Sequence, residues 1–241
     1  MLPKMNAPPK AISQSEIRFA ILAVDVAVIA VVNDEPHILL VPVHLPPDIV
    51  RARALPGGLV HPHETAEEAA ARHLTDTCGL GGSYSEQLWT FSGIDRDPRG
   101  RVVSVAYLVL VPENVARNHP LPEGLSWCPA TRVKALAYDH NKIVDAALER
   151  LRAKLHSTTI ARHLLAPRFT LSELQSTYEN VLGRSLDKRN FRKKLLGSGI
   201  VKATGKKLQS ALGRPSELYR FAGSKVEVIS VLSGTGSGDI F

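Results

Sequence analysis

The first part of the chain contains runs of apolar, largely β-branched residues, a pattern typical of buried β-strands. Positions 19–32 and 37–43 both show it. Between them, Asn33-Asp34-Glu35-Pro36 combines residues that favour turns. The pattern therefore predicts two strands joined as a hairpin. The segment 45–54 that follows mixes prolines with arginines and is expected to form a loop.

A helical period replaces the strand pattern at 65–78. Every fourth residue there is apolar, which places these side chains on one face of a helix: Ala66, Ala70 and Leu74. Thr65, followed three residues later by Glu68, forms a capping box that marks the start of the helix. Strands are then predicted at 87–91 and 102–111, joined through a turn at 97–100, and a helix at 138–155. These elements make up a first domain over 18–156, after a loose leader at 1–17.

The pattern changes again near residue 157. A short helix is predicted at 158–165, ended by Pro167, and Thr170 with Glu173 forms a second capping box. The helix that this box starts ends at Gly183, and its apolar face consists of Leu171, Leu174, Tyr178 and Val181. A third helix is predicted at 187–198, and strands at 200–204 and 218–221 enclose a loop rich in glycine and lysine. This second domain is expected to cover 157–223, followed by a tail at 224–241.

Composition and charge narrow the class of protein. Of the 241 residues, 44% are apolar and 22% are charged, as in ordinary globular proteins. The longest apolar run, 14 residues interrupted by Asp25, is shorter than the roughly 20 that span a bilayer, so no membrane partner is expected. Two cysteines and the lack of a recognisable secretory signal favour the reducing cytoplasm. Residues 157–223 carry 13 Lys and Arg against 4 Asp and Glu, an excess that points to a nucleic-acid partner.

Residues 58–80 resemble a Nudix box, the loop-helix-loop signature of a hydrolase family. Six fixed positions of the family pattern are occupied in register: Gly58, Glu64, Arg72, Leu74, Gly79 and Leu80. The preceding Leu55-Pro56-Gly57 also matches the usual approach to the box. The resemblance implies an α+β or α/β fold that begins with a Nudix-like α/β/α sandwich. It also implies a pocket for a nucleoside diphosphate linked to another group.

The box departs from the family pattern where the family has three glutamates. His73, Asp76 and Thr77 stand at those positions. In active members the glutamates hold the divalent cations that bridge the pyrophosphate, and a histidine or threonine is a poor ligand for Mg²⁺. We therefore expect no catalytic residue, no required cofactor and no metal site. A relaxed metal site would use Glu64, Glu68 and Asp76. The spacing of His61, His63, His73 and Cys78 matches no compact zinc motif.

Ligand binding can persist in a domain that has lost hydrolysis. Gly57 and Gly58 permit a phosphate to approach the backbone closely. Three arginines are candidates for charge-assisted hydrogen bonds to it: Arg51, Arg53 and Arg72. Each has an alternative role. Arg72 can instead bridge Glu68 and Asp76 on its own helix, and Arg51 and Arg53 can be solvated loop residues.

The predicted helix at 187–198 is basic on one side and apolar on the other. Phe191 and Leu195 are expected to pack inward, whereas Arg189, Arg192 and Lys193 share the opposite side. Such a helix fits the major groove of DNA, where arginine and lysine read guanine and asparagine reads adenine. The preceding helix completes a helix-turn-helix, and the basic loop after it forms a wing. The candidate DNA contacts are Thr170, Lys188, Arg189, Asn190, Arg192, Lys193, Thr204, Lys206, Lys207 and Arg214.

Taken together, these segments resemble the NrtR family, the Nudix-related transcriptional regulators of NAD metabolism. The most specific stretches are 169–175, 186–195, Thr204-Gly205 and 213–221. The resemblance implies a bacterial, cytoplasmic repressor of NAD biosynthesis or salvage genes, with a C-terminal winged helix-turn-helix domain. It also implies a homodimer that binds double-stranded DNA at an inverted repeat, and a nucleotide effector, usually ADP-ribose, that releases the DNA.

Two alternatives stay open at this point. The first is an active Nudix pyrophosphatase that hydrolyses ADP-ribose with the help of Glu64, Glu68 and Asp76. The second is a DNA-binding protein whose Nudix domain serves only as a dimerisation scaffold. Hydrolysis of ADP-ribose distinguishes the first from a repressor, and failure to bind any nucleotide distinguishes the second.

Overall fold

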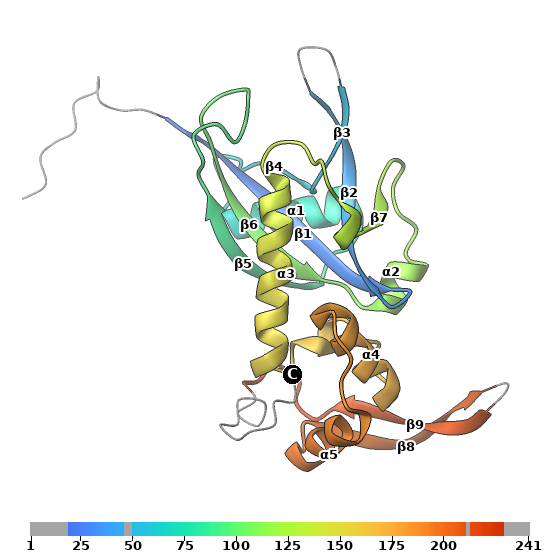
Figure 1. Ribbon diagram of the computed structural model, residues 1–241. Helices are drawn as coiled ribbons and strands as arrows, with labels where there is room; N and C mark the ends of the chain where they lie inside the picture. Colours follow the sequence, from blue (N-terminus) through green and yellow to red (C-terminus); the bar gives the residue numbers. More distant parts are fainter. Residues whose placement is uncertain (1–18, 46–49, 211–212, 229–241) are drawn as a thin grey trace, which may run out of the picture.

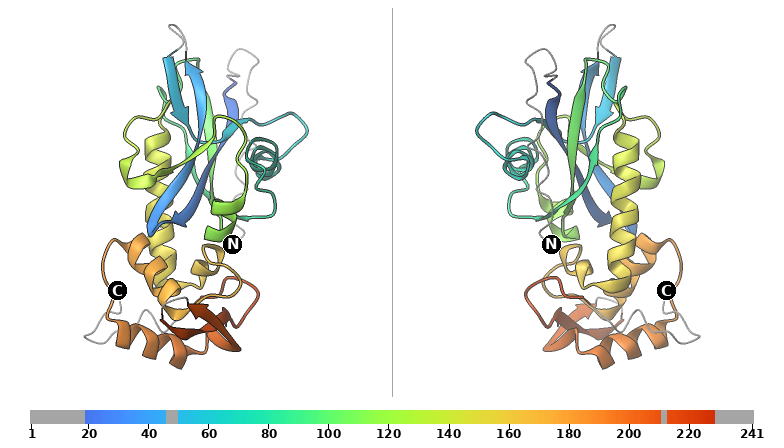
Figure 2. Two further views of the ribbon diagram at one scale, coloured as in Figure 1. Left: turned by 90° about the vertical axis from the view of Figure 1, so that its right-hand side faces the viewer. Right: turned by 90° about the vertical axis from the view of Figure 1, so that its left-hand side faces the viewer.

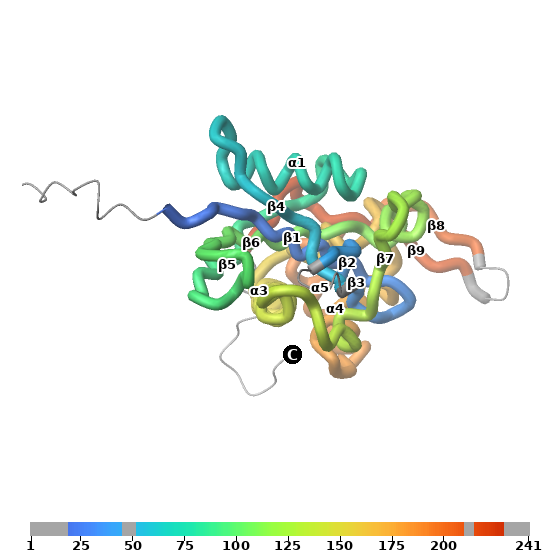
Figure 3. The backbone as a smooth tube through the Cα atoms, turned by 90° about the horizontal axis from the view of Figure 1, so that it is seen from above, coloured from blue at the N-terminus to red at the C-terminus, as the bar shows by residue number. Residues whose placement is uncertain are grey.

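A computed structural model describes residues 19–45, 50–210 and 213–228 (Figure 1). The expected leader at 1–17 and most of the tail at 224–241 lie outside these residues. A seven-stranded sheet forms the centre of the larger part of the molecule, with α1 (Ala66–Cys78) on one face and α3 (His140–Ser157) on the other (Figures 2 and 3). This arrangement is the α/β/α sandwich that the sequence predicted.

The sheet has a mixed topology. Its strands are β1 (Ile21–Val32), β2 (Glu35–Leu45), β3 (Val50–Ala54), β4 (Gly57–Leu59), β5 (Tyr84–Phe91), β6 (Val102–Leu110) and β7 (Ser126–Pro129). The order along the main path is β3-β2-β1-β6-β5; β4 pairs with β1, and β7 pairs with β2. The predicted β1–β2 hairpin is confirmed, and its turn places Asn33 and Asp34 at positive φ angles of 50° and 59°. β1 and β6 are parallel, so their hairpins lie side by side in one sheet.

The second, smaller part of the molecule contains three helical segments and a two-stranded ribbon. They are the 3₁₀ helix η3 (Ile160–His163), α4 (Leu171–Leu182), α5 (Lys188–Ser198), β8 (Val201–Ser210) and β9 (Gly213–Phe221). α4 starts at the predicted capping box of Thr170 and ends at Gly183 in the left-handed conformation. This is the winged helix-turn-helix that the pattern predicted. Two short helices complete the chain: α2 (Glu113–Asn118) and η2 (Ala130–Arg132).

Three predictions of local structure were wrong. Part of the expected loop at 45–54 is the strand β3, which pairs with the edge of β2 through Val41 and Ala54. The helix expected at 158–165 is only the four residues of η3. The loop expected between 204 and 218 is mostly paired strand, with Lys207 opposite Glu217. β3 and the ribbon lack a long apolar run, because β3 is short and most of the ribbon's side chains face solvent.

Two apolar clusters hold the molecule together, one on each face of the sheet. The cluster under α1 includes Val26, Ala70 and Leu74. The cluster under α3 continues without a break into the winged helix, where it includes the predicted core of α4 and α5: Leu171, Leu174, Tyr178, Val181, Phe191 and Leu195. The long helix α3 extends from the sheet to the second part of the molecule (Figure 1). Among the described residues, no helix is long and apolar enough to cross a membrane.

Candidate functional site

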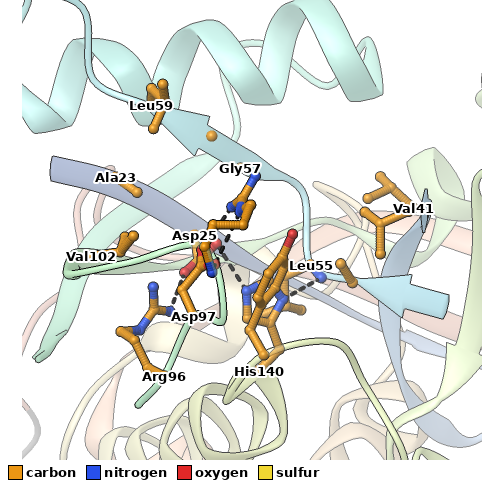
Figure 4. Close-up of a pocket in the computed structure, with 15 residues that line it drawn as sticks. Ala23, Asp25, Val41, Leu55, Gly57, Leu59, Arg96, Asp97, Val102 and His140 are labelled. Atoms are coloured by element: carbon orange, nitrogen blue, oxygen red, sulfur yellow. Dashed lines mark hydrogen bonds and ion pairs between the residues drawn. The ribbon is translucent and has the colours of Figure 1, made fainter. Parts of the chain in front are cut away.

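A cavity of about 250 Å³ opens beside the sheet where β1, β4, the 96–99 loop and the start of α3 meet (Figure 4). Gly57 and Gly58, two of the predicted ligand-binding residues, line it. Its floor carries charged side chains from three distant parts of the chain, which the fold brings together. The cavity is therefore a candidate binding site for a polar ligand.

The floor is built around the buried carboxylate of Asp25. Arg96 donates to Asp25 at 3.0 Å, the Ser104 hydroxyl donates at 2.6 Å, and His140 Nε2 lies 3.2 Å away. Arg96 also donates to Asp139 at 2.8 Å. Burial raises the pKa of Asp25, but the hydrogen bonds from His140 and Ser104 and the charge of Arg96 hold it below the ordinary carboxyl value.

A backbone hydrogen bond fixes which ring nitrogen of His140 carries the hydrogen. The Leu55 amide donates to His140 Nδ1 at 2.9 Å, so this nitrogen carries no proton and the hydrogen is on Nε2, facing Asp25. The ring is thereby held between the segment before β4 and the carboxylate in β1 (Figure 4). An oriented imidazole and guanidinium give the cavity a rigid polar floor.

The rim of the cavity can meet an anion and a planar group. Arg99 pairs with Asp97 at 2.7 Å, and its guanidinium lies 5.2 Å from the ring centre of Tyr138. The hydrogen bond from Arg99 holds the pKa of Asp97 below its ordinary value. More than half of the Arg99 side chain is exposed to solvent. Arg99 is thus available for charge-assisted hydrogen bonds to a phosphate, next to an aromatic surface.

The two glycines are needed for packing within the protein. A Cβ atom on Gly57 would lie 2.2 Å from the Val24 carbonyl oxygen, because β4 pairs closely with β1. A Cβ atom on Gly58 would lie 2.7 Å from the ring of His73. The sequence predicts that these glycines admit a phosphate, and both of them line the cavity. Their lack of a side chain also allows the close approach of β1 and of the His73 ring.

Two of the three predicted arginines, Arg53 and Arg72, do not line the cavity. Arg53 donates to the Leu40 carbonyl at 3.3 Å and to the Ser126 hydroxyl, so its side chain contacts β2 and β7 instead. The side chain of Arg51 lies outside what the structure describes. Arg72 forms an ion pair with Glu64 and donates to the Leu59 carbonyl at 3.1 Å. The alternative expected for Arg72, a bridge between Glu68 and Asp76, does not form.

The Nudix-like box does not assemble a metal site. The hydrogen bonds from Arg72 lower the pKa of Glu64 to about 2 and occupy both of its oxygens. Glu68 is bonded to Thr65 in the capping box, and Asp76 is exposed. Within the described ranges, no three His, Cys, Asp or Glu residues are grouped so that they could hold a metal ion. The side chains present therefore do not fit the divalent cations of an active Nudix enzyme.

Sequence reasoning missed the residues that form the floor. Five floor residues were not among the candidate ligand-binding residues: Asp25, Arg96, Ser104, Asp139 and His140. One local signal was available: Asp25 interrupts an apolar strand, and a buried charge there requires partners. Arg96 and His140 carry no such signal, since they lie 71 and 115 positions further along the chain.

A second candidate site is the basic surface of the winged helix. α5 and the β8–β9 ribbon lie at the end of the molecule opposite β3 and β4 (Figures 1 and 2). Six of the predicted DNA contacts are exposed there: Lys188, Arg189, Asn190, Lys193, Lys206 and Lys207. Three others also have contacts within the protein. Thr170 caps α4, the Thr204 hydroxyl donates to the Leu218 carbonyl, and Arg192 donates to Ser172. Arg214 lies in β9, but its side chain is outside the described part.

Comparison with known protein families matches both halves of the chain. Residues 161–221 match the NrtR DNA-binding winged helix domain, and residues 22–148 match the Nudix domain. The Nudix match includes the box and the strands around the cavity, and the winged helix match covers α4, α5 and the ribbon.

Individual relatives match either most of the chain or a part of it. The ADPR responsive transcriptional repressor NtrR of Acinetobacter baylyi is 33% identical over 214 residues, which cover 87% of this chain and 85% of the relative. The crystal structure of Shewanella oneidensis NrtR complexed with a 27mer DNA superimposes with a TM-score of 0.72 at 29% identity, covering 83% of this chain and 93% of that one. An ADP-ribose pyrophosphatase of Methanocaldococcus jannaschii is 34% identical over 91 residues, 38% of this chain and 54% of that enzyme.

Proposed function

Because the chain belongs to the NrtR family, we propose that it is a DNA-binding transcriptional repressor that responds to ADP-ribose or a related nucleotide. A sensor domain over 18–156 would precede a DNA-binding domain over 157–223. The observation that carries the proposal is the exposed basic face of α5 beside the ribbon, in a chain 33% identical to an ADP-ribose-responsive repressor. The regulated genes would be those of NAD biosynthesis or salvage in a bacterial cytoplasm.

The DNA-binding surface would use α5 for the major groove and the ribbon for the backbone. Recognition helices approach base edges with their N-terminal residues. Four candidate contacts are exposed at or near this end of α5: Lys188, Arg189, Asn190 and Lys193. Lys206 and Lys207 are exposed on the ribbon and suit phosphates or the minor groove. One such helix reads few base pairs, so a homodimer on an inverted repeat would double the readout.

The effector would bind in the cavity above Asp25. Arg99 at the rim suits a diphosphate, and Tyr138 suits a planar or sugar surface. An effector that prefers the conformation of the protein unable to bind DNA lowers DNA affinity by the ratio of its two affinities. The carboxylates of the box do not form a metal site, which supports binding of the nucleotide without its hydrolysis.

Fluorescence anisotropy with promoter fragments of NAD-synthesis genes tests the proposal, at fixed salt because phosphate contacts dominate affinity. We expect specific binding that ADP-ribose reverses. Arg189→Ala should weaken operator binding, while Arg132→Ala, which removes an exposed arginine from the sensor domain, should not. Absence of specific DNA binding by the unmodified protein would overturn the proposal.

Product analysis in the same titration separates the alternatives. ADP-ribose should remain intact in the presence of Mg²⁺; release of AMP that Glu64→Gln abolishes would establish a pyrophosphatase instead. Specific DNA binding, combined with no heat of binding for any nucleotide, would leave the Nudix domain as a scaffold.

A further inference from the structure

A second, smaller cavity lies inside the winged helix, where the start of α4, the middle of α5 and the strand β9 meet. Its volume is about 190 Å³, and its polar lining includes Ser172, Arg192, Ser216, Glu217 and Tyr219. It is distinct from the effector cavity in the sensor domain. Because α5 and the ribbon are the elements proposed above to contact DNA, an occupant of this cavity affects how the protein binds the duplex.

Arg192 is the cation of this cavity and differs from the other basic residues of α5. Lys188, Arg189 and Lys193 are exposed, whereas Arg192 is half-buried. Its Nη2 donates to the Ser172 hydroxyl at 2.9 Å. Its Nε is buried and has no hydrogen-bond partner among the described residues. An unsatisfied donor on a buried guanidinium is costly, and an acceptor entering the cavity would remove that cost.

The other groups of the cavity favour an anion of low charge. Ser216 offers a hydroxyl, and the cavity reaches the first turn of α4, where backbone amides have no partner within the helix. Glu217 also lines the cavity, and its carboxylate accepts a hydrogen bond from the Tyr219 hydroxyl at 3.2 Å. The carboxylate would oppose a dianion more strongly than a singly charged phosphodiester.

We propose that this cavity receives one phosphate of the DNA backbone, bound by Arg192 in the orientation that Ser172 sets. The proposal rests on the function argued above. It gives Arg192 a different role from its neighbours on α5: Arg192 fixes the position of the helix on the duplex, and the exposed side chains read the bases. Ser172 acts as a positioning residue, since it contacts DNA only through Arg192.

Salt dependence tests the proposal, because each phosphate contact contributes about 0.9 to the slope of log K against log salt. The affinities of Arg192→Gln, Arg189→Gln and Arg132→Gln are measured at several salt concentrations. Each variant is tested on an operator duplex located by footprinting and on a random duplex of equal length. We expect Arg192→Gln to weaken both complexes by the same factor, roughly tenfold, and to reduce the slope by about 0.9 for each bound protomer. Arg189→Gln should mainly reduce the preference for the operator, and Arg132→Gln should change neither quantity.

Two further variants distinguish a phosphate contact from a structural role. Arg192→Lys keeps the charge and should keep the slope while losing part of the affinity. Ser172→Ala should weaken both complexes but leave the slope unchanged, because the guanidinium remains. Thermal melting of each variant verifies the fold. The proposal is overturned if Arg192→Gln leaves the slope unchanged, or if it weakens the operator complex alone. Failure of the unmodified protein to bind either duplex would instead overturn the proposed function.

Discussion

At the scale of single residues, Asp25 links folding to pH. Its carboxylate is buried beneath Arg96 and His140, and its pKa lies below the ordinary value. A carboxyl group with a depressed pKa in the folded state stabilises the fold fully above its unfolded pKa of about 3.9, and this contribution is lost as the pH falls toward the folded value. Asp25→Asn should therefore lower the free energy of unfolding by about 3 kcal/mol at pH 7.

Urea unfolding between pH 7 and pH 3 measures this difference. It should be constant at neutral pH and shrink below about pH 4, because the unfolded chain then binds a proton at Asp25 while the folded protein still holds this carboxyl charged. Asp95→Asn removes an exposed acid from the neighbouring loop and serves as the control. A difference between Asp25→Asn and the unmodified protein that stays the same at pH 3 would contradict the ionic role of Asp25.

The role of a residue was predictable where its partner is close in the sequence, and was not predictable where its partner is far along the chain. Thr65 and Thr170 cap their helices as expected, because the cap and its partner are three positions apart. Arg96 meets Asp25 across 71 positions, and Leu55 meets His140 across 85. No spacing rule covers such contacts. The sheet topology brings them together, and the topology was not predictable from one sequence.

At the scale of elements, the two capping boxes offer a matched comparison. In α1 and in α4, a threonine accepts from the backbone amide three residues on, and a glutamate at that position accepts from the threonine amide. Thr65→Ala and Thr170→Ala should each lower the free energy of unfolding by about 1 kcal/mol, whereas the serine variants should stay close to the unmodified protein. The midpoints of urea unfolding of the alanine and serine variants measure these differences. An unchanged midpoint for either alanine variant would show that its cap contributes nothing.

The elements that the sequence revealed are those with a strong period or a cap. Four helices have a strong apolar period, a cap or both, and they were predicted close to their bounds: α1, α3, α4 and α5. β3, β4 and β7 are five residues or fewer, too short for an alternation to show. The ribbon was predicted only at its base, where Val201 pairs with Phe221 and both side chains are buried. Pairing across an exposed ribbon needs no apolar pattern, so the sequence does not reveal its length.

At the scale of the whole molecule, one turn of the sensor sheet makes hydrogen bonds to the DNA-binding domain. Asp34, at the tip of the β1–β2 hairpin, accepts from the Ser176 hydroxyl at 2.8 Å and from the Asn180 amide at 3.3 Å. Both donors lie on α4, the helix that packs against α5 through Tyr178 and Phe191. A change in the sheet around the effector cavity can therefore reach α5 through α4, because β1 carries both Asp25 and the start of this turn.

Removing this contact should uncouple the two sites without removing either. Asp34→Gly suits the test, because glycine accepts the positive φ of this turn position and lacks the carboxylate. We expect each ligand alone to bind Asp34→Gly with nearly its normal affinity, while the weakening of DNA binding by saturating ADP-ribose shrinks toward none. Coupling is reciprocal, so the effect of DNA on ADP-ribose affinity must shrink by the same factor. Asp34→Asn keeps an acceptor oxygen and should retain most of the coupling. Full coupling in Asp34→Gly would show that the signal reaches α5 by another route, such as the apolar cluster under α3.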